Sequence, residues 1–362
     1  MSPTALIATG GYSRSGTGRG RGIELLRITT ADADSEAGAA QHVQDVEHLA
    51  TVDLPDPSFV LWSAEGTLLY AVLETSPTRV VAVRVAADGR SAEVAADLPL
   101  EGSGGCHLAF GRSPSTLVVA DYGSGTVETV RLDADGLPTE VIDVDDHHDR
   151  ADGQDPHPHQ VRTLPGTEKL AVPDLGLDRV FLYRQDLEGQ MGLCGEIPLS
   201  RGSGPRHIAP DHESELLHIS CELSGMVATA ARQPLESTRS APAALGGTVH
   251  RWSVRSMIPA STRPGENFPS HIELAGEDAL LLVANRGPDT LSVLSLTMMR
   301  PEIVAEIEVG AHPRHFTRLG DLVLVAAQEA DRIDVLQLQG EELSVAGEPI
   351  PAPSVACLAV RP

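Results

Sequence analysis

The chain of 362 residues repeats one short pattern six times, and this repeat constrains the fold more than any other feature. Each copy reads as an apolar strand, a polar turn, a second strand that ends near a polar residue, and then a third strand. The copies begin at Ser58, Cys106, His159, Arg206, Ser270 and Arg314. Self-similarity at such a period, with short strands and turn residues, is typical of the four-stranded blades of a β-propeller.

Each copy carries an aromatic or imidazole side chain at its start, which we call the anchor residue. The expected anchors are Phe59, His107, His159, His207, His271 and His315. The longest interval between anchors separates His207 from His271 and contains residues 233–268, which are rich in Pro, Ser, Ala and Gly. A strand-like core at residues 248–253 has irregular sequence on both sides. We therefore predict an insertion or long loop within one blade there, not a domain boundary.

The two ends of the chain predict a seventh blade. Residues 354–360 resemble an inner strand with nothing after it, whereas residues 5–10 and 22–28 resemble later strands with no inner one. Joining the ends would close the ring and remove exposed strand edges. The sequence thus predicts an all-β fold, with residues 1–362 forming a single seven-bladed propeller domain of four-stranded antiparallel blades.

The charge balance narrows the class of partner. The chain has 51 acidic and 27 basic residues, a net charge of -24. This excess argues against binding to nucleic acid or to an anionic membrane, because both require a basic surface. The N-terminus lacks the pattern of a signal peptide, and no apolar stretch is long enough to span a bilayer. The four cysteines are scattered, so we expect free thiols in a cytoplasmic protein.

Polar residues at the strand ends form a candidate site. If Arg206 and Glu222 flank an antiparallel hairpin, the hairpin brings them together with His207 at one edge of a sheet. In a propeller, the starts of inner strands and the ends of second strands meet at one mouth of the central channel. Two structural interpretations compete with this one. The recurring histidines could serve only as hydrogen-bonding residues, and Arg206 with Glu222 could be an ion pair between strands.

Several motifs, in order along the chain, resemble one known family. They are DYGSG from Asp121, DPHPHQV from Asp155, PDLGLDRVFLY from Pro173, GPRH from Gly204, CEL from Cys221, VANRG from Val283 and HPRHF from His312. The chain is similar to the seven-bladed propeller lactonases, which include 6-phosphogluconolactonases and 3-carboxy-cis,cis-muconate cyclases. Three motifs depart from the family's usual forms, since DYGSG, CEL and ANR stand for NYGSG, NEL and SNR.

The resemblance implies four catalytic positions: His159 (or its neighbour His157), Arg206, Glu222 and Arg286. A lactonase needs a base to activate water and cationic donors for the oxyanion. We expect Glu222 or His159 to be the base, and Arg206 and Arg286 to bind the oxyanion and anionic groups. Further expected substrate-binding residues are His157, Asp174, His207, His271, Asn285, Arg314 and His315.

The expected activity is therefore hydrolysis of an anionic sugar lactone of the 6-phosphogluconolactone type, without a metal or organic cofactor. A cycloisomerase of the muconate type and a non-catalytic binding scaffold are the alternatives. The segment 143–159 holds six aspartates and four histidines, side chains that can bind a divalent metal. Their order matches neither an EF-hand nor a zinc signature, which favours a solvated loop.

Overall fold

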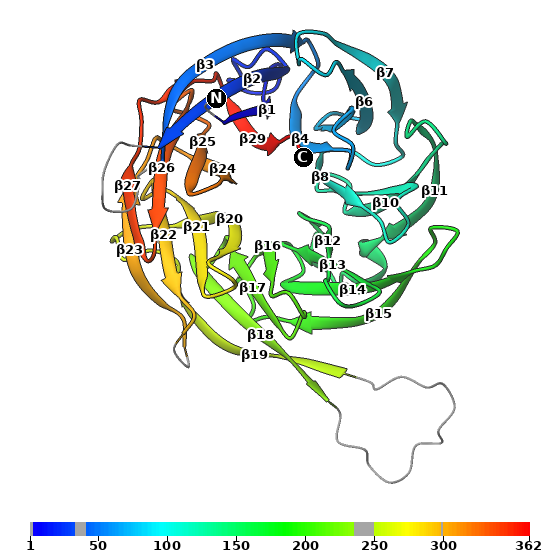
Figure 1. Cartoon of the computed structure of the whole chain (residues 1–362). Coiled ribbons are helices and arrows are strands. Elements are labelled where there is room, and N and C mark those ends of the chain that lie inside the picture. Colours follow the sequence, from blue (N-terminus) through cyan, green and yellow to red (C-terminus); the bar gives the residue numbers. More distant parts are fainter. Residues whose placement is uncertain (1–2, 33–40, 235–249, 298–299) are drawn as a thin grey trace, which may run out of the picture.

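Seven antiparallel sheets form a ring around a central axis in the computed structural model (Figure 1). The structure describes residues 3–32, 41–234, 250–297 and 300–362. Within these ranges the chain has one short 3-10 helix, His147–Arg150, and no helix that is long and apolar enough to cross a membrane. The prediction of a seven-bladed, all-β propeller is confirmed.

We number the blades along the chain and give the strands of each from the axis outwards. Blade 1 is β29 (Val355–Val360), β1 (Thr4–Gly11), β2 (Ile23–Asp32) and β3 (Gln41–Val52). Blade 2 is β4 (Pro57–Trp62), β5 (Leu68–Leu73), β6 (Arg79–Val85) and β7 (Ala92–Pro99). Blade 3 is β8 (Gly105–Phe110), β9 (Thr116–Asp121), β10 (Thr126–Leu132) and β11 (Pro138–Asp146). Blade 4 is β12 (Arg162–Thr163), β13 (Lys169–Asp174), β14 (Arg179–Gln185) and β15 (Met191–Pro198).

The remaining three blades follow the same order. Blade 5 is β16 (Pro205–Pro210), β17 (Leu216–Cys221), β18 (Met226–Pro234) and β19 (His250–Pro259). Blade 6 is β20 (Phe268–Ala275), β21 (Leu280–Arg286), β22 (Thr290–Ser295) and β23 (Glu302–Glu308). Blade 7 is β24 (Pro313–Leu319), β25 (Leu322–Ala327), β26 (Arg332–Gln339) and β27 (Glu342–Val345), with β28 (Ile350–Pro351) as a fifth strand beside β26.

The two ends of the chain meet in blade 1, as predicted. Strand β29 pairs antiparallel with β1, from Ile7 opposite Val360 to Gly10 opposite Cys357. Cys357 and Leu358 are buried. This pairing closes the ring. Because β29 covers the inner edge of β1, that edge is not left open.

The hydrophobic core lies between neighbouring blades. Every residue of β5 is buried, because blades on both sides cover the middle strands of a sheet. One core cluster joins Ala8 and Leu25 of blade 1 to Val60 and Leu69 of blade 2, and similar clusters fill the other seams. Continuous apolar runs such as LLYAVL therefore form strands that are covered on both faces.

The long interval in blade 5 contains an extended hairpin. Strands β18 and β19 pair from Met226 opposite Pro259 to Pro234 opposite His250, and the hairpin projects beyond the ring (Figure 1). Part of the predicted insertion is thus the outer strand of the blade. The segment 235–249, which includes the start of the expected strand core, lies outside the described residues.

A β-bulge recurs at the start of the inner strands. The first inner residue pairs with the end of the second strand, as in Pro205 opposite Cys221, and the register then shifts so that His207 pairs with Ser220. The first residue inside the irregularity occupies what we call the bulge position. On the second strand, the residue that follows the pair next to the bulge occupies the exit position. The bulge positions hold Ser58, Cys106, His159, Arg206, Ser270, Arg314 and Ala356. The exit positions hold Tyr12, Glu74, Tyr122, Leu175, Glu222, Arg286 and Gln328.

This register corrects one anchor. Pro158 bridges Asp174 as Pro205 pairs with Cys221, and Arg162 pairs with Ala171. The anchor of blade 4 is therefore Gln160, and His159 occupies the bulge position equivalent to Arg206. The prediction of His159 as an anchor is wrong by one residue, because a His-Gln pair hides the bulge in the sequence.

Candidate active site

Glu222 lies between two arginines that come from different blades. Its Oε2 is 2.9 Å from Nε of Arg206 and 2.5 Å from a terminal nitrogen of Arg286. Arg206 is 2% exposed and Arg286 9%, whereas Glu222 keeps 19% of its side chain accessible. The three predicted residues thus form one cluster, with only the carboxylate substantially open to solvent.

The backbone at Gly204 places this cluster. The amide of Glu222 donates to the carbonyl of Gly204 at 2.7 Å, which joins the turn before β16 to the exit position. Gly204 has a φ of 61°, and a Cβ there would lie 2.4 Å from the side chain of Leu223. Only glycine avoids both the strained backbone and the collision, which explains the first residue of the GPRH motif.

The charges in the cluster shift one another's ionisation. Burial raises the pKa of Glu222, but the Arg206 and Arg286 guanidiniums outweigh burial and hold that pKa below its usual value. Burial and the neighbouring Arg286 lower the pKa of Arg206 to about 9. One terminal nitrogen of Arg206, Nη1, is buried without a hydrogen-bond partner in the described part of the chain. A buried guanidinium donor without a partner is costly unless a ligand or water accepts from it.

His159 faces the same cluster from blade 4. Burial lowers its pKa well below the usual value, and the Arg206 charge lowers it further. The imidazole is therefore neutral at neutral pH. Its Nδ1 lies 3.7 Å from Sγ of Cys106, the bulge-position residue of blade 3. No described residue forms a hydrogen bond with its Nε2.

His157 makes structural contacts at the neighbouring blade. Its Nδ1 donates to the backbone carbonyl of Tyr122 at 2.9 Å, and its ring stacks on Tyr122 with 4.3 Å between centroids. The ring of Tyr122 also meets His159 edge-on at 5.6 Å. His157 therefore orients Tyr122 and has its Nδ1 occupied, whereas His159 is the histidine that adjoins Arg206.

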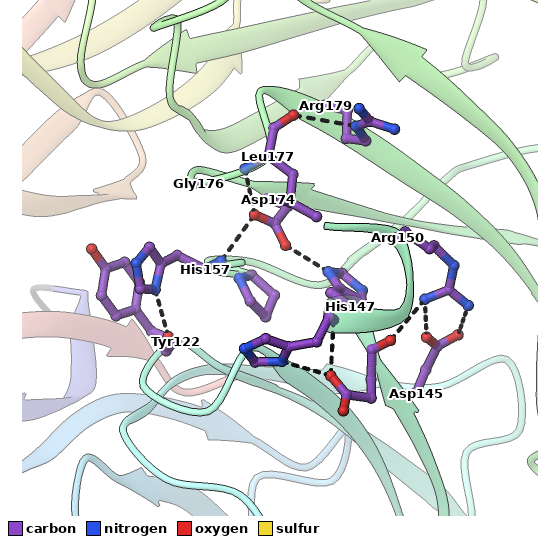
Figure 2. A network of polar contacts seen from close by, with 12 residues as sticks. Tyr122, Asp145, His147, Arg150, His157, Asp174, Gly176, Leu177 and Arg179 are labelled. Atoms are coloured by element: carbon purple, nitrogen blue, oxygen red, sulfur yellow. Dashed lines mark hydrogen bonds and ion pairs between the residues drawn. The ribbon is translucent and has the colours of Figure 1, made fainter. Parts of the chain in front are cut away.

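Asp174 lies behind the site and holds the loop that carries both histidines (Figure 2). The carboxylate is fully buried and accepts from the amides of His157 and Leu177, each at 2.9 Å. It also accepts from Nδ1 of His147 at 2.6 Å, and Nε2 of His147 lies 2.8 Å from the Tyr183 hydroxyl. This placement makes Asp174 a positioning residue and leaves it no surface for the predicted contact with substrate.

The histidine anchors form a layer beneath the mouth. Phe59, His107, His207, His271 and His315 contact one another in a circuit around the axis, with ring centroids 4.0 to 5.7 Å apart. Burial lowers the pKa of each histidine, that of His271 to about 3. All four are therefore neutral at neutral pH.

Anchor side chains also link adjacent blades. Nδ1 of His107 accepts from the amide of Val161, Oε1 of Gln160 from Ile208, and Nδ1 of His315 from Leu358. This recurring bond supports the structural interpretation of the anchors. Asn285 is likewise buried, and its amide nitrogen donates to the hydroxyls of Thr290 and Ser292.

Arg314 reaches the mouth from blade 7 with two partners that the sequence analysis did not select. Its guanidinium lies 5.1 Å from the ring centroid of Tyr12, and the Tyr12 hydroxyl donates to Glu74 at 2.7 Å. Tyr12, Tyr122 and Glu74 share the exit position with Glu222 and Arg286. An alignment of all seven repeats on the bulge would have found them, since they occupy one column.

His312 is a second unpredicted neighbour. It lines a pocket of about 290 Å³ beside Arg286, together with Phe268, Gly287, Asp289 and Glu329. Burial and the adjacent arginines lower the pKa of His312 to about 4. Of the three clustered residues, only Arg286 lines this pocket.

The acidic segment 143–159 forms internal contacts. Asp145 binds Arg150, Asp146 accepts from the amide of His148, and Asp143 accepts from the amide of Met191. Among the described residues, no group of three or more His, Cys, Asp or Glu side chains is arranged to hold a metal ion.

Comparisons with known proteins agree with this fold. A profile described as "Lactonase, 7-bladed beta-propeller" matches residues 7–360. The 6-phosphogluconolactonase of Bacillus subtilis is 24% identical over 73% of this chain and 74% of its own. The solved structure of a periplasmic gluconolactonase from Pseudomonas aeruginosa has a TM-score of 0.81 at 22% identity, and the match covers 99% of both chains. A 6-phosphogluconolactonase candidate from Bacteroides fragilis has a TM-score of 0.80 at 20% identity, over 99% of this chain and 98% of that one. The match over nearly the whole chain places this protein in the seven-bladed β-propeller lactonase family.

Proposed function

We propose that the protein hydrolyses a sugar lactone of the 6-phosphogluconolactone type at the Arg206–Glu222–Arg286 cluster. The observation that carries the proposal is the buried Nη1 of Arg206, which has no acceptor in the described chain although it lies beside an accessible carboxylate. Family membership and the names of the relatives favour the same chemistry. The proposal includes an anionic small-molecule substrate, no cofactor and action in the cytoplasm.

The residues divide the reaction as follows. Water attacks the lactone carbonyl and gives a proton to Nε2 of His159, whose neutral imidazole can accept it. Arg206 donates to the oxyanion of the tetrahedral intermediate, a role worth about 10²–10³ in rate for one such donor. The ring C–O bond then breaks, and the departing oxygen takes the proton from His159.

Glu222 orients the two arginines in this scheme. Its carboxylate is ionised and bound by two guanidiniums, which makes it a weaker base than an unpaired carboxylate. If Glu222 were instead the base, its replacement would cost at least as much rate as replacement of His159. Replacing Glu222 and His159 in turn therefore distinguishes which of the two is the base, a choice that the sequence left open.

The test is a panel of phosphorylated and unphosphorylated sugar lactones with four proteins. We expect wild type to hydrolyse at least one lactone well above the enzyme-free rate, and His159→Gln to lose about 10²–10⁴ in kcat. Glu222→Gln should lose less kcat and raise KM. The exposed Glu188→Gln serves as the matched control and should equal wild type.

Two outcomes would contradict the proposal. One is a wild-type rate equal to the enzyme-free rate on every lactone. The other is unchanged hydrolysis in both His159→Gln and Glu222→Gln. Conversion of a carboxymuconate by rearrangement without net lactone hydrolysis would indicate the cycloisomerase alternative.

A further inference from the structure

A second carboxylate–cation group stands at the same mouth, built by blades 1, 2 and 7. Tyr12 and Glu74 occupy exit positions, and Arg314 occupies the bulge position that Arg206 fills in blade 5. The Tyr12 hydroxyl donates to Oε2 of Glu74 at 2.7 Å, and the Arg314 guanidinium lies over the Tyr12 ring. The two groups are therefore built from equivalent backbone positions.

The two groups differ in whether their arginines are already paired. Glu222 contacts both Arg206 and Arg286. The guanidinium of Arg314, in contrast, forms no hydrogen bond or ion pair with any described residue, and only the face of Tyr12 supports it. The carboxylates of Glu74 and Glu222 contribute to the negative potential that keeps Arg314 protonated. Its five N–H donors are thus charged and free to bind a ligand.

The support beneath Arg314 is rigid. Burial raises the pKa of Tyr12, so its hydroxyl remains protonated and donates to Glu74. The loop after Tyr12 is fixed by Asp56, whose Oδ1 accepts from the amides of Ser13, Arg14 and Ser15 at 2.7 to 3.1 Å. The backbone carbonyl of Asp56 also accepts from the amide of Glu74. One buried residue therefore sets the positions of both Tyr12 and Glu74.

We propose that Tyr12 and Glu74 are positioning residues that present Arg314 to an anionic group of the substrate, remote from the bond that is cleaved. The Tyr12 ring fixes the plane of the guanidinium, and the bond to Glu74 fixes the ring. This division assigns the reacting carbonyl to the Arg206–Glu222–Arg286 cluster and the anionic substituent to Arg314. The kinetic part of this inference rests on the proposed lactone hydrolysis. The binding of an anion by Arg314 does not depend on it.

The kinetic test compares 6-phosphogluconolactone with uncharged gluconolactone. For the phosphorylated lactone, Tyr12→Leu should raise KM about tenfold and leave kcat within about twofold, because a cation–π support and its orientation are lost. Tyr12→Phe keeps the ring and should raise KM only about threefold, and Glu74→Gln should behave like it. For the uncharged lactone, KM should stay within about twofold in all three variants. A merely structural role would instead alter both substrates alike and would therefore overturn the assignment.

The binding test does not depend on turnover. Inorganic phosphate is titrated calorimetrically into wild type, Arg314→Gln and Arg184→Gln, the last being an exposed arginine on β14 that serves as the control. We expect Arg314→Gln to weaken phosphate binding at least tenfold and Arg184→Gln to leave it unchanged. Equal phosphate affinity in wild type and Arg314→Gln, or no binding to wild type, would refute the inference. If wild type hydrolyses no lactone but Arg314→Gln still binds phosphate more weakly than wild type, the proposed function is wrong and the anion site at Arg314 is supported.

Discussion

The side chains at the mouth depend on one another for their charge states. His159 has a pKa lowered by burial, and Glu222 has one lowered by its two arginines despite burial. Both are needed in their deprotonated forms, so acid inactivates only when the pH falls below their ordinary values. Arg206 is needed protonated, and its pKa is lowered to about 9. We therefore expect the proposed site to work between an acidic limit well below the ordinary pKa of histidine and an alkaline limit near pH 9.

This reasoning predicts the pH dependence of kcat/KM. We expect a plateau across neutral pH, an alkaline decline with a midpoint near 9, and no decline on the acid side until the pH lies well below the ordinary pKa of a histidine. Initial rates are measured in overlapping buffers, with the enzyme-free rate subtracted at each pH because lactones open spontaneously in base. An acid midpoint at 6.5 or above would show that a histidine in an ordinary environment, and not His159, limits the reaction.

Asp121 provides a separate prediction about stability. Its carboxyl is fully buried, and burial raises its pKa to about 8, so the folded protein binds a proton at pH 7 that the unfolded chain releases. Stability attributable to this group is fully present below the ordinary pKa of an aspartate and falls as the pH rises towards 8. Asp121→Asn, which restores the residue usual in the resembling family, removes the titration.

We expect Asp121→Asn to be more stable than wild type at pH 8, by on the order of 5 kcal/mol in the free energy of unfolding, and to differ little at pH 4. Urea melts at both pH values measure the change, with Asp135→Asn, at an exposed turn residue, as the control. A gain of the same size at both pH values would mean that the carboxyl is not the titrating group.

At the scale of elements, the strand ends form the site only because each blade begins with the same bulge. Repeated strands and turns sufficed to predict the blades and the closing of blade 1 by β29, since those depend on patterns of apolar residues. The bulge has no such pattern. The sequence pattern therefore selects His159 in place of Gln160 as the anchor of blade 4, and it does not show that Asp174 is equivalent to Cys221 and lies one position before the exit position.

The presence or absence of a recognisable motif explains which site residues could be predicted from the sequence. Arg206, Glu222, Arg286 and Arg314 stand in recognisable motifs, and the structure brings them to one mouth. Tyr12 and Glu74 come from repeats without such motifs, and their proximity depends on ring closure between distant parts of the chain. Local sequence patterns therefore do not predict that Tyr12 and Glu74 lie close together.

The loop that carries His159 gives the prediction at this scale. Asp174 accepts three hydrogen bonds in a buried setting (Figure 2), so Asp174→Ala should destabilise the fold by about 2–4 kcal/mol. In protein that remains folded, we expect kcat to fall with little change in KM, because His159 loses its support. The readouts are urea denaturation and lactone kinetics. A raised KM with unchanged stability would favour the direct substrate contact first expected for Asp174.

At the scale of the whole molecule, the arginines at the mouth produce a positive local potential on a protein whose overall charge is negative. The chain carries a net charge of -24, yet Arg206, Arg286 and Arg314 converge at the mouth, where Glu222 and Glu74 lie beside them. An approaching anion therefore meets long-range repulsion first and short-range attraction last. Salt separates the two, because the screening length falls from about 30 Å at 0.01 M to about 8 Å at 0.15 M.

Contacts within the mouth are shorter than either screening length and lie in a buried setting, so salt weakens them less than it weakens the repulsion from distant carboxylates. We therefore expect kcat/KM for the phosphorylated lactone to rise about two- to fivefold between 0.01 and 0.15 M salt. Uncharged gluconolactone, measured in parallel, should show no change and controls for effects on the fold. A fall in kcat/KM with salt would mean that the arginines dominate the field well beyond the mouth, and that the acidic surface has no part in how substrate arrives.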